Sequence, residues 1–170
     1  MDMLTDPEMK DIVDDFVNES KQLLDQLEET LEALEEDPNK TGLETFGQTI
    51  DRIMGAAKSI GANKIGMYCE LGKIIGYKSS QADGPELIKL VVPILFDSVE
   101  ILQGMLDSVS KGKGEVLTEI NTEAFGTRLK WLADKFNDIE RSSVALESGA
   151  VSNKVTGNKE LNSLLTELGL

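Results

Sequence analysis

Apolar residues recur at three- and four-residue steps along most of the chain, which is the spacing of one face of an α-helix. The first such segment runs from Glu8 to Glu36 and contains no glycine or proline, so we expect one long amphipathic helix there. Its inward positions are Ile12, Phe16, Ser20, Leu24, Leu27, Leu31 and Leu34. No stretch of useful length alternates between apolar and polar residues as a half-buried strand does.

Short stretches rich in proline, glycine, serine or asparagine separate further helical segments. These stretches are EEDPNKTG at 35–42, SIGANKIG at 59–66, SSQADGPE at 79–86 and SKGKGE at 110–115. Thr41 is the expected N-cap of the second helix, because a hydroxyl there can accept a hydrogen bond from the first turn. The fourth helix is expected from about Pro85 to Val109, with Pro93 as a kink or a fresh start.

Each of these later segments carries its own apolar stripe. The second helix has Leu43, Phe46, Ile50, Ile53, Met54 and Ala57. The third has Met67, Leu71, Ile74 and Ile75. The fourth has Leu87, Leu90, Val91, Ile94, Leu95, Val99, Leu102 and Leu106. The fifth, over about 121–140, has Phe125, Leu129, Leu132 and Phe136. The fold class is therefore all-α, an up-and-down bundle of about five helices.

The composition changes after Arg141. Residues 142–157 are short of large apolar side chains and rich in serine, glycine and asparagine, so we expect a flexible linker there. Within 158–170, Leu161, Leu164, Leu165 and Leu168 form an i, i+3, i+4, i+7 stripe on a segment too short to be a stable helix alone. It is either a terminal helix that docks on its own bundle or a partner-binding peptide. The expected division is thus a bundle over 1–141, a linker and a terminal peptide.

Length and charge narrow the possible functions. The chain has 170 residues, near the usual size of one domain, and a formal net charge of −14, which repels nucleic acids and anionic membranes. No apolar run reaches the length of a membrane span, and the N-terminus MDMLTDPEMK is acidic, so we expect a cytoplasmic protein without membrane insertion. Because the chain has no histidine and one cysteine, we expect neither phosphohistidine chemistry, nor a disulfide, nor a bound metal or cofactor.

The second helix also carries an unusual polar row. Glu44, Gln48, Asp51 and Gly55 fall one turn apart along the border of its exposed face. From spacing alone, Glu44 and Gln48 are ordinary solvated surface residues. A glutamine amide can nevertheless orient a water molecule, because its oxygen accepts and its nitrogen donates, and it needs no adjusted pKa to do so.

Residues 15–109 resemble the histidine phosphotransfer domain of the chemotaxis kinase CheA. The likeness lies in the long acidic first helix, a second helix that should carry the phospho-accepting histidine, and the glycine turn SIG at 59–61. Asp51 falls where that histidine belongs, so the resemblance implies a docking face for a response-regulator receiver without phosphotransfer. We do not expect Asp51 to accept phosphate, since no acidic pocket or lysine is evident around it on its own helix.

The string ETFGQTIDRIM resembles the active helix of the CheZ phosphatases, which act on the receiver CheY. It fits the pattern acid-x-x-G-Q-x-I-x-R-x-M. The matching residues are Glu44, Gly47, Gln48, Ile50, Arg52 and Met54. The terminal ELNSLLTELGL is similar to the receiver-binding peptide of the same family, with paired leucines and a hydrophobic ending at Leu170.

These resemblances imply a protein that dephosphorylates a CheY-like receiver whose aspartyl phosphate lies beside Mg²⁺ and a lysine. In that interpretation Gln48 orients the attacking water and Glu44 reaches the receiver lysine. Asp51, Arg52 and Gly55 would be contacts of the same helix. The terminal leucines Leu161, Leu164, Leu165, Leu168 and Leu170 would bind the receiver.

Two other interpretations use the same residues differently. A non-catalytic pseudo-phosphotransfer adaptor would bind or sequester a receiver or kinase, and would not need the amide of Gln48. A purely structural bundle would have no receiver interaction. The sequence leaves open whether the bundle forms a homodimer.

Overall fold

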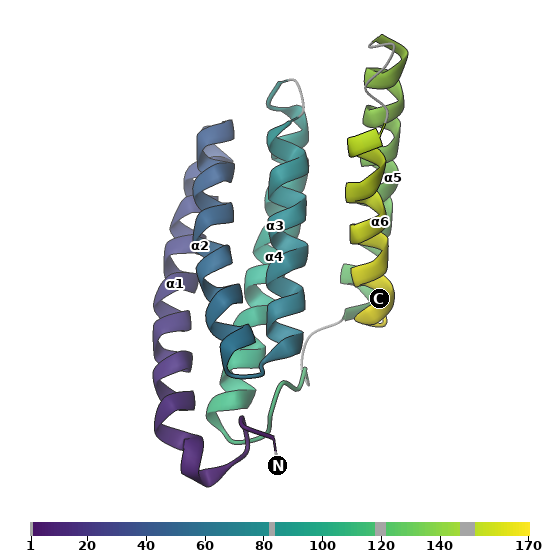
Figure 1. Ribbon diagram of the computed structural model, residues 1–170. Helices are drawn as coiled ribbons and strands as arrows, with labels where there is room; N and C mark the ends of the chain where they lie inside the picture. Colours follow the sequence, from purple (N-terminus) through teal and green to yellow (C-terminus); the bar gives the residue numbers. More distant parts are fainter. Residues whose placement is uncertain (1, 82–83, 118–121, 147–151) are drawn as a thin grey trace. The chain divides into compact units, whose positions relative to one another are not determined.

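A computed structural model describes residues 2–81, 84–117, 122–146 and 152–170. In order along the chain, its elements are a 3₁₀ turn at Pro7–Met9, α1 at Lys10–Glu36, α2 at Lys40–Ser59, α3 at Asn63–Ser80, α4 at Glu86–Ser110, α5 at Thr122–Leu146 and α6 at Ser152–Glu167. No strand occurs within the described ranges, which confirms the all-α fold class (Figure 1). No described helix is long and apolar enough to cross a bilayer.

The chain forms two compact units, residues 1–120 and residues 121–170. In the first unit α1 packs against α2 and α4, and α3 packs against the same two helices, so the four helices form a closed ring (Figure 1). Short connections join antiparallel neighbours, as in an up-and-down bundle. In the second unit α5 packs against α6.

This division differs from the expected boundary at residue 141. The fifth helix belongs with α6 in the second unit. It continues to Leu146 because no glycine or proline follows Arg141 until Gly149, and α6 already begins at Ser152. The segment 142–157, expected as a linker, therefore lies largely within these two helices, apart from 147–151, which fall outside the described residues.

The core of the first unit is made by the predicted apolar stripes. Side chains with no exposed surface include Leu27, Leu31, Phe46, Ile50, Leu71, Ile75, Leu95 and Leu102. Gly72 of α3 brings α2 and α3 especially close, because a Cβ built on it would lie 2.8 Å from Cδ1 of Ile50. The close contact sets the position of the outward face of α2 relative to α3.

Some residues expected in the core lie elsewhere, because the buried face of the helix is shifted by one residue or because another face of the helix is buried. Ile12 and Leu90 are 52% and 45% exposed, and their neighbours Val13 and Val91 point into the core instead. Met67 and Ile74 are half-buried. The apolar residues of α3 cover too much of the helix for their spacing to select one face. The buried side of α3 is formed by Ile65, Gly66, Tyr68, Cys69, Leu71, Gly72, Ile75, Gly76 and Ser79.

The start of α2 also corrects the sequence analysis. Asn39, not Thr41, is the N-cap, and its Oδ1 accepts a hydrogen bond from the N–H of Gly42 at 2.7 Å. Asn is as good a capping residue as Thr and stands directly after Pro38, where the previous segment has ended. Thr41 lies inside the first turn. In α4, by contrast, the helix continues through the exposed Pro93 without a fresh start.

A distant carboxylate caps α3. Its own N-cap residue, Ala62, has no side chain that can accept a hydrogen bond. Oε1 of Glu115, in the segment after α4, accepts from the N–H of Ile65 at 2.7 Å. Partial burial raises the pKa of Glu115 above its ordinary value, and hydrogen bonds from the N–H groups of Ile65 and Lys64 offset part of that shift. The cap fixes the first turn of α3 beside the segment that follows α4.

Candidate functional site

The polar row of α2 stands in solvent. Glu44, Gln48, Asp51 and Gly55 are all exposed, while Phe46 and the other stripe residues of the same helix are buried beneath them. The direction of the row is therefore fixed by core packing on the opposite side of α2. Residues one turn apart on a helix lie roughly 5–6 Å from each other, so a partner surface can contact the whole row at once.

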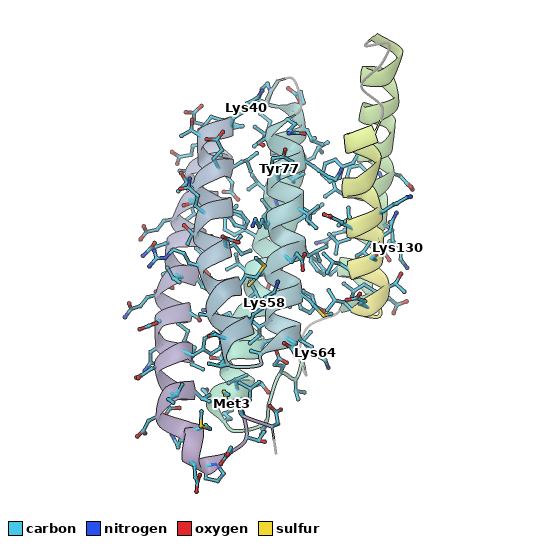
Figure 2. The ribbon with its side chains drawn as sticks, in the orientation of Figure 1. Met3, Lys40, Lys58, Lys64, Tyr77 and Lys130 are labelled. Carbon is cyan, nitrogen blue, oxygen red and sulfur yellow. The ribbon has the colours of Figure 1, made fainter. Side chains whose placement is uncertain are left out.

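An open groove with a volume of about 290 Å³ runs beside this row, between α2 and α3. Its lining residues are Leu43, Glu44, Gly47, Gln48 and Asp51 of α2, and Lys73, Gly76, Tyr77 and Ser80 of α3. Tyr77 is 65% exposed, and Figure 2 shows it on α3 near the end of the helix pair that also carries Lys40. A Cβ built on Gly47 meets no atom within 4 Å, so the groove is open at that position. Both candidate catalytic side chains, Glu44 and Gln48, thus border a recess and not a flat surface.

Lys73 is the charged partner of Asp51. Its Nζ donates to Oδ1 of Asp51 at 2.7 Å, and the two side chains are 46% and 50% exposed. Such an exposed pair contributes roughly 0–1 kcal/mol. A lysine thus accompanies Asp51 after all, but it comes from α3 and not from the helix of Asp51.

Sequence reasoning missed Lys73, Tyr77 and the rest of the α3 side of the groove. Lys73 and Asp51 are 22 positions apart, and only the register between α2 and α3 brings them together. The sequence carries one signal: Lys73, Tyr77 and Ser80 lie three or four residues apart, which puts them on one side of α3. Which side faces α2 could not be derived from α3 alone.

Two further residues of the α2 prediction lie outside the groove. Arg52 and Gly55 are exposed but are not among its lining residues. A Cβ built on Gly55 meets nothing within 4 Å, so the surface there is open to a partner. Glu44 has no ion pair within the described residues. Its carboxylate is therefore available to a cation from outside.

The terminal leucines are in the opposite situation. Leu161, Leu164 and Leu165 are buried, and Leu168 and Leu170 are half-buried. The helix that carries them packs against α5 in the same unit, and the partner-binding role of these leucines stays a prediction.

The C-terminal end of α6 is closed by a local turn. Gly169 has a φ of +73°, and the N–H of Leu170 donates to the carbonyl oxygen of Leu165 at 2.8 Å, which is the glycine-ended cap that commonly terminates helices. A Cβ built on Gly126 of α5 would lie 3.2 Å from Cβ of Leu170. Only a glycine leaves Leu170 this close to α5 without displacing it.

The described residues offer little other chemistry. They contain no group of three or more cysteine, aspartate or glutamate side chains that could hold a metal ion. Cys69 is fully buried, and burial raises the pKa of its thiol far above the ordinary value, which removes it as a nucleophile. The groove can therefore act through an amide, carboxylates and an ammonium group. The chain matches no protein-family model, no curated protein and no solved structure in comparisons with each.

Proposed function

We propose that the protein binds a phosphorylated CheY-like receiver and accelerates hydrolysis of its aspartyl phosphate, with Gln48 positioning the attacking water. The observation that carries the proposal is the exposure of Glu44 and Gln48, one turn apart beside an open groove, on a helix whose other side is fixed in the core. The motif resemblance supplies the partner, and the geometry supplies an accessible amide.

The reaction requires this chain only to orient the attacking water. The water oxygen attacks phosphorus in line, the bond from phosphorus to the aspartyl oxygen breaks, and the products are inorganic phosphate and the receiver carboxylate. Mg²⁺ held by the receiver would supply neutralisation of the developing charge. Gln48 accepts a hydrogen bond from the water through Oε1 and donates through Nε2 to a neighbouring oxygen, which holds the water in the direction of attack.

The remaining residues contribute binding and orientation. Glu44 can pair with the receiver lysine, since no cation within the described residues occupies it. Arg52 and Gly55 would extend the contact along α2, beyond the groove. Asp51 is a secondary contact, because its carboxylate is already paired with Lys73. The terminal leucines would add affinity when α6 is presented to the receiver.

The direct test follows the lifetime of the aspartyl phosphate on a CheY-type receiver with and without the protein. We expect Gln48→Ala to lower the accelerated rate by about 10²-fold while the Kd for the receiver changes less than about twofold, because the amide acts mainly in the transition state. Gln22→Ala is the matched control, since it removes the same amide from an exposed position on α1. Full activity in the Gln48 variant would refute the water-positioning role.

A non-catalytic adaptor is the second candidate. It is favoured by the pairing of Asp51 with Lys73, at the position where the resemblance to phosphotransfer domains calls for a histidine. An aspartate cannot form a phosphohistidine, and the described residues hold no acidic cluster that could bind Mg²⁺ beside it, but the surface around Asp51 can still bind a receiver. An unchanged phosphate lifetime together with saturable receiver binding would select the adaptor over the phosphatase.

A further inference from the structure

Charge is distributed very unevenly over the first unit. Residues 40–80, which form α2 and α3, contain six lysine or arginine residues against three acidic ones, a net charge of +3. The whole chain carries −14, so the remaining residues carry −17. In α1 alone, ten acidic residues face two lysines, a net charge of −8. A strongly acidic protein thus contains one helix pair of the opposite sign.

The bundle separates these charges in space. α1 and α3 each pack against α2 and α4, so they occupy opposite corners of the four-helix ring (Figure 1). With neighbouring axes roughly 8–10 Å apart, the diagonal is roughly 11–14 Å. The Debye length at physiological ionic strength is about 8 Å, so the charge of α1 is largely screened at α3, on the far corner of the ring. α2 packs directly against α1, and its outward residues therefore lie nearer to that acidic helix.

Two lysines stand at the ends of the polar row. Lys40 in the first turn of α2 and Lys58 in its last turn are both exposed, and neither has an ion pair in the described part of the chain (Figure 2). Lys58 also lies along the contact between α2 and α3, since a Cβ built on Gly66 would be 3.3 Å from its Cγ. On α1, by contrast, Lys10 and Lys21 are paired with Asp14 and Asp107.

From this charge pattern we infer that the outer surface of α2 and α3 docks an acidic protein surface, with Lys40 and Lys58 as contacts at its two edges. The identity of the partner as a phosphorylated receiver rests on the proposed function. The receiver surface is acidic at the point of contact because it carries the aspartyl phosphate. Lys40 and Lys58 therefore bind the partner, while Gln48 between them acts on the phosphate.

The dimensions favour a compact protein partner over a nucleic acid. Lys58 lies 18 positions after Lys40, which is roughly 27 Å along a helix. A standard protein interface covers about 800 Å² per partner, a patch of similar width. A nucleic acid presents phosphates far beyond that distance and would meet the acidic remainder of the chain.

The test compares two double variants of equal net charge. Lys40→Gln with Lys58→Gln and Lys10→Gln with Lys21→Gln both change −14 to −16. Binding is measured to a CheY-type receiver held in its phosphorylated form by beryllium fluoride and Mg²⁺. We expect the α2 pair to raise Kd about tenfold at low salt and about twofold at high salt, and the α1 pair to change it less than about twofold.

Equal effects of the two pairs would overturn the inference, because net charge alone would then explain the binding. Melting temperatures of both variants within a few degrees of the parent protein show that the changes act on binding and not on folding.

A second arm separates this inference from the proposed function. If the receiver does not bind, the proposed function fails, and a polyglutamate peptide then probes the surface by itself. Amide shifts in the NMR spectrum that concentrate on α2 and α3, and disappear in the Lys40 and Lys58 variant, support the acidic docking surface. Shifts elsewhere, or no shifts at all, overturn the inference. A DNA duplex that binds through the same lysines more tightly than the polyglutamate peptide also overturns it.

Discussion

The two helices that carry the candidate residues, α2 and α6, present them in opposite ways. On α2 the polar row stands in solvent and the apolar stripe is buried. On α6, which packs against α5, the candidate residues are themselves the apolar stripe, and Leu161, Leu164 and Leu165 are buried. One helix displays its proposed binding residues, and the other conceals them.

The difference follows from the chemistry of the residues. Polar side chains gain nothing from entering a core, so a row of them stays exposed when the opposite face of the helix packs. Burial of a leucine side chain is favourable by roughly 1.5–3 kcal/mol, so leucines pack against an apolar surface of their own chain unless a binding partner offers a more favourable one. A polar site can therefore be read from an amphipathic pattern, whereas an apolar binding stripe cannot be distinguished from a core stripe.

Removing a buried leucine of α6 should have the largest effect. Leu161 has no exposed surface, so we expect Leu161→Ala to destabilise the packing of α6 by about 2–5 kcal/mol. Amide hydrogen exchange of α6 measures this directly, and the exposed neighbour in Asn162→Ala serves as the control. If exchange is unchanged while the KM for phosphorylated receiver rises, α6 is a free tether and the contrast with α2 disappears.

Two glycines offer a second, smaller contrast. Ala is favoured over Gly in a helix by roughly 0.5–1 kcal/mol, so Gly47→Ala on the open side of α2 should stabilise the protein by that amount. Gly126→Ala should give no such gain, because the new Cβ would lie 3.2 Å from Cβ of Leu170. Urea unfolding compares the two variants. Deleting Leu170 should restore the gain at Gly126, and failure to do so would remove the inferred contact.

A pH effect is expected from Glu115, the residue that caps α3, the helix that forms the second side of the groove. Burial raises the pKa of Glu115, so the folded state holds its proton to a higher pH than the unfolded state does. Its favourable contribution is present below the ordinary pKa of 4.5 and is lost as pH rises through the raised value. Glu115→Gln keeps an acceptor for the N–H of Ile65 without the charge.

This variant should therefore be more stable than the parent protein at neutral pH, with a difference that shrinks towards pH 4. Chemical unfolding across that range tests the sign. A difference that grows on acidification would mean that the ionised carboxylate is the favoured form in the cap.

The smallest effect is expected at the ion pair. Asp51→Asn removes an exposed charge pair, which should cost about 0–1 kcal/mol and leave receiver dephosphorylation in place. Lys73→Met is the companion change, because it breaks the same pair from α3. A large loss of activity in both variants would show that the pair orients the site, and a stable acyl phosphate on Asp51 would make it an acceptor.

The sequence predicted the helices well, because proline and glycine separate strongly periodic segments. Its errors arise where several residues satisfy the same rule. Asn39 and Thr41 can both cap α2, and the apolar residues of α3 fit more than one face. The α2 side of the candidate site was accessible to sequence reasoning because one helix carries it. The α3 side was not, since Lys73 and Tyr77 line the groove only through the packing of the two helices.

The burial of Cys69 means that the labelling rate of its thiol reports how often α3 opens. It is the single thiol of the protein, it lies in α3, and it has no exposed surface. A thiol reagent can reach it only when α3 opens, so the labelling rate equals the intrinsic rate multiplied by the fraction of time that the helix is open. A partner bound across α2 and α3 would slow that reaction in proportion to its occupancy, which gives docking a readout that needs no added probe on the surface.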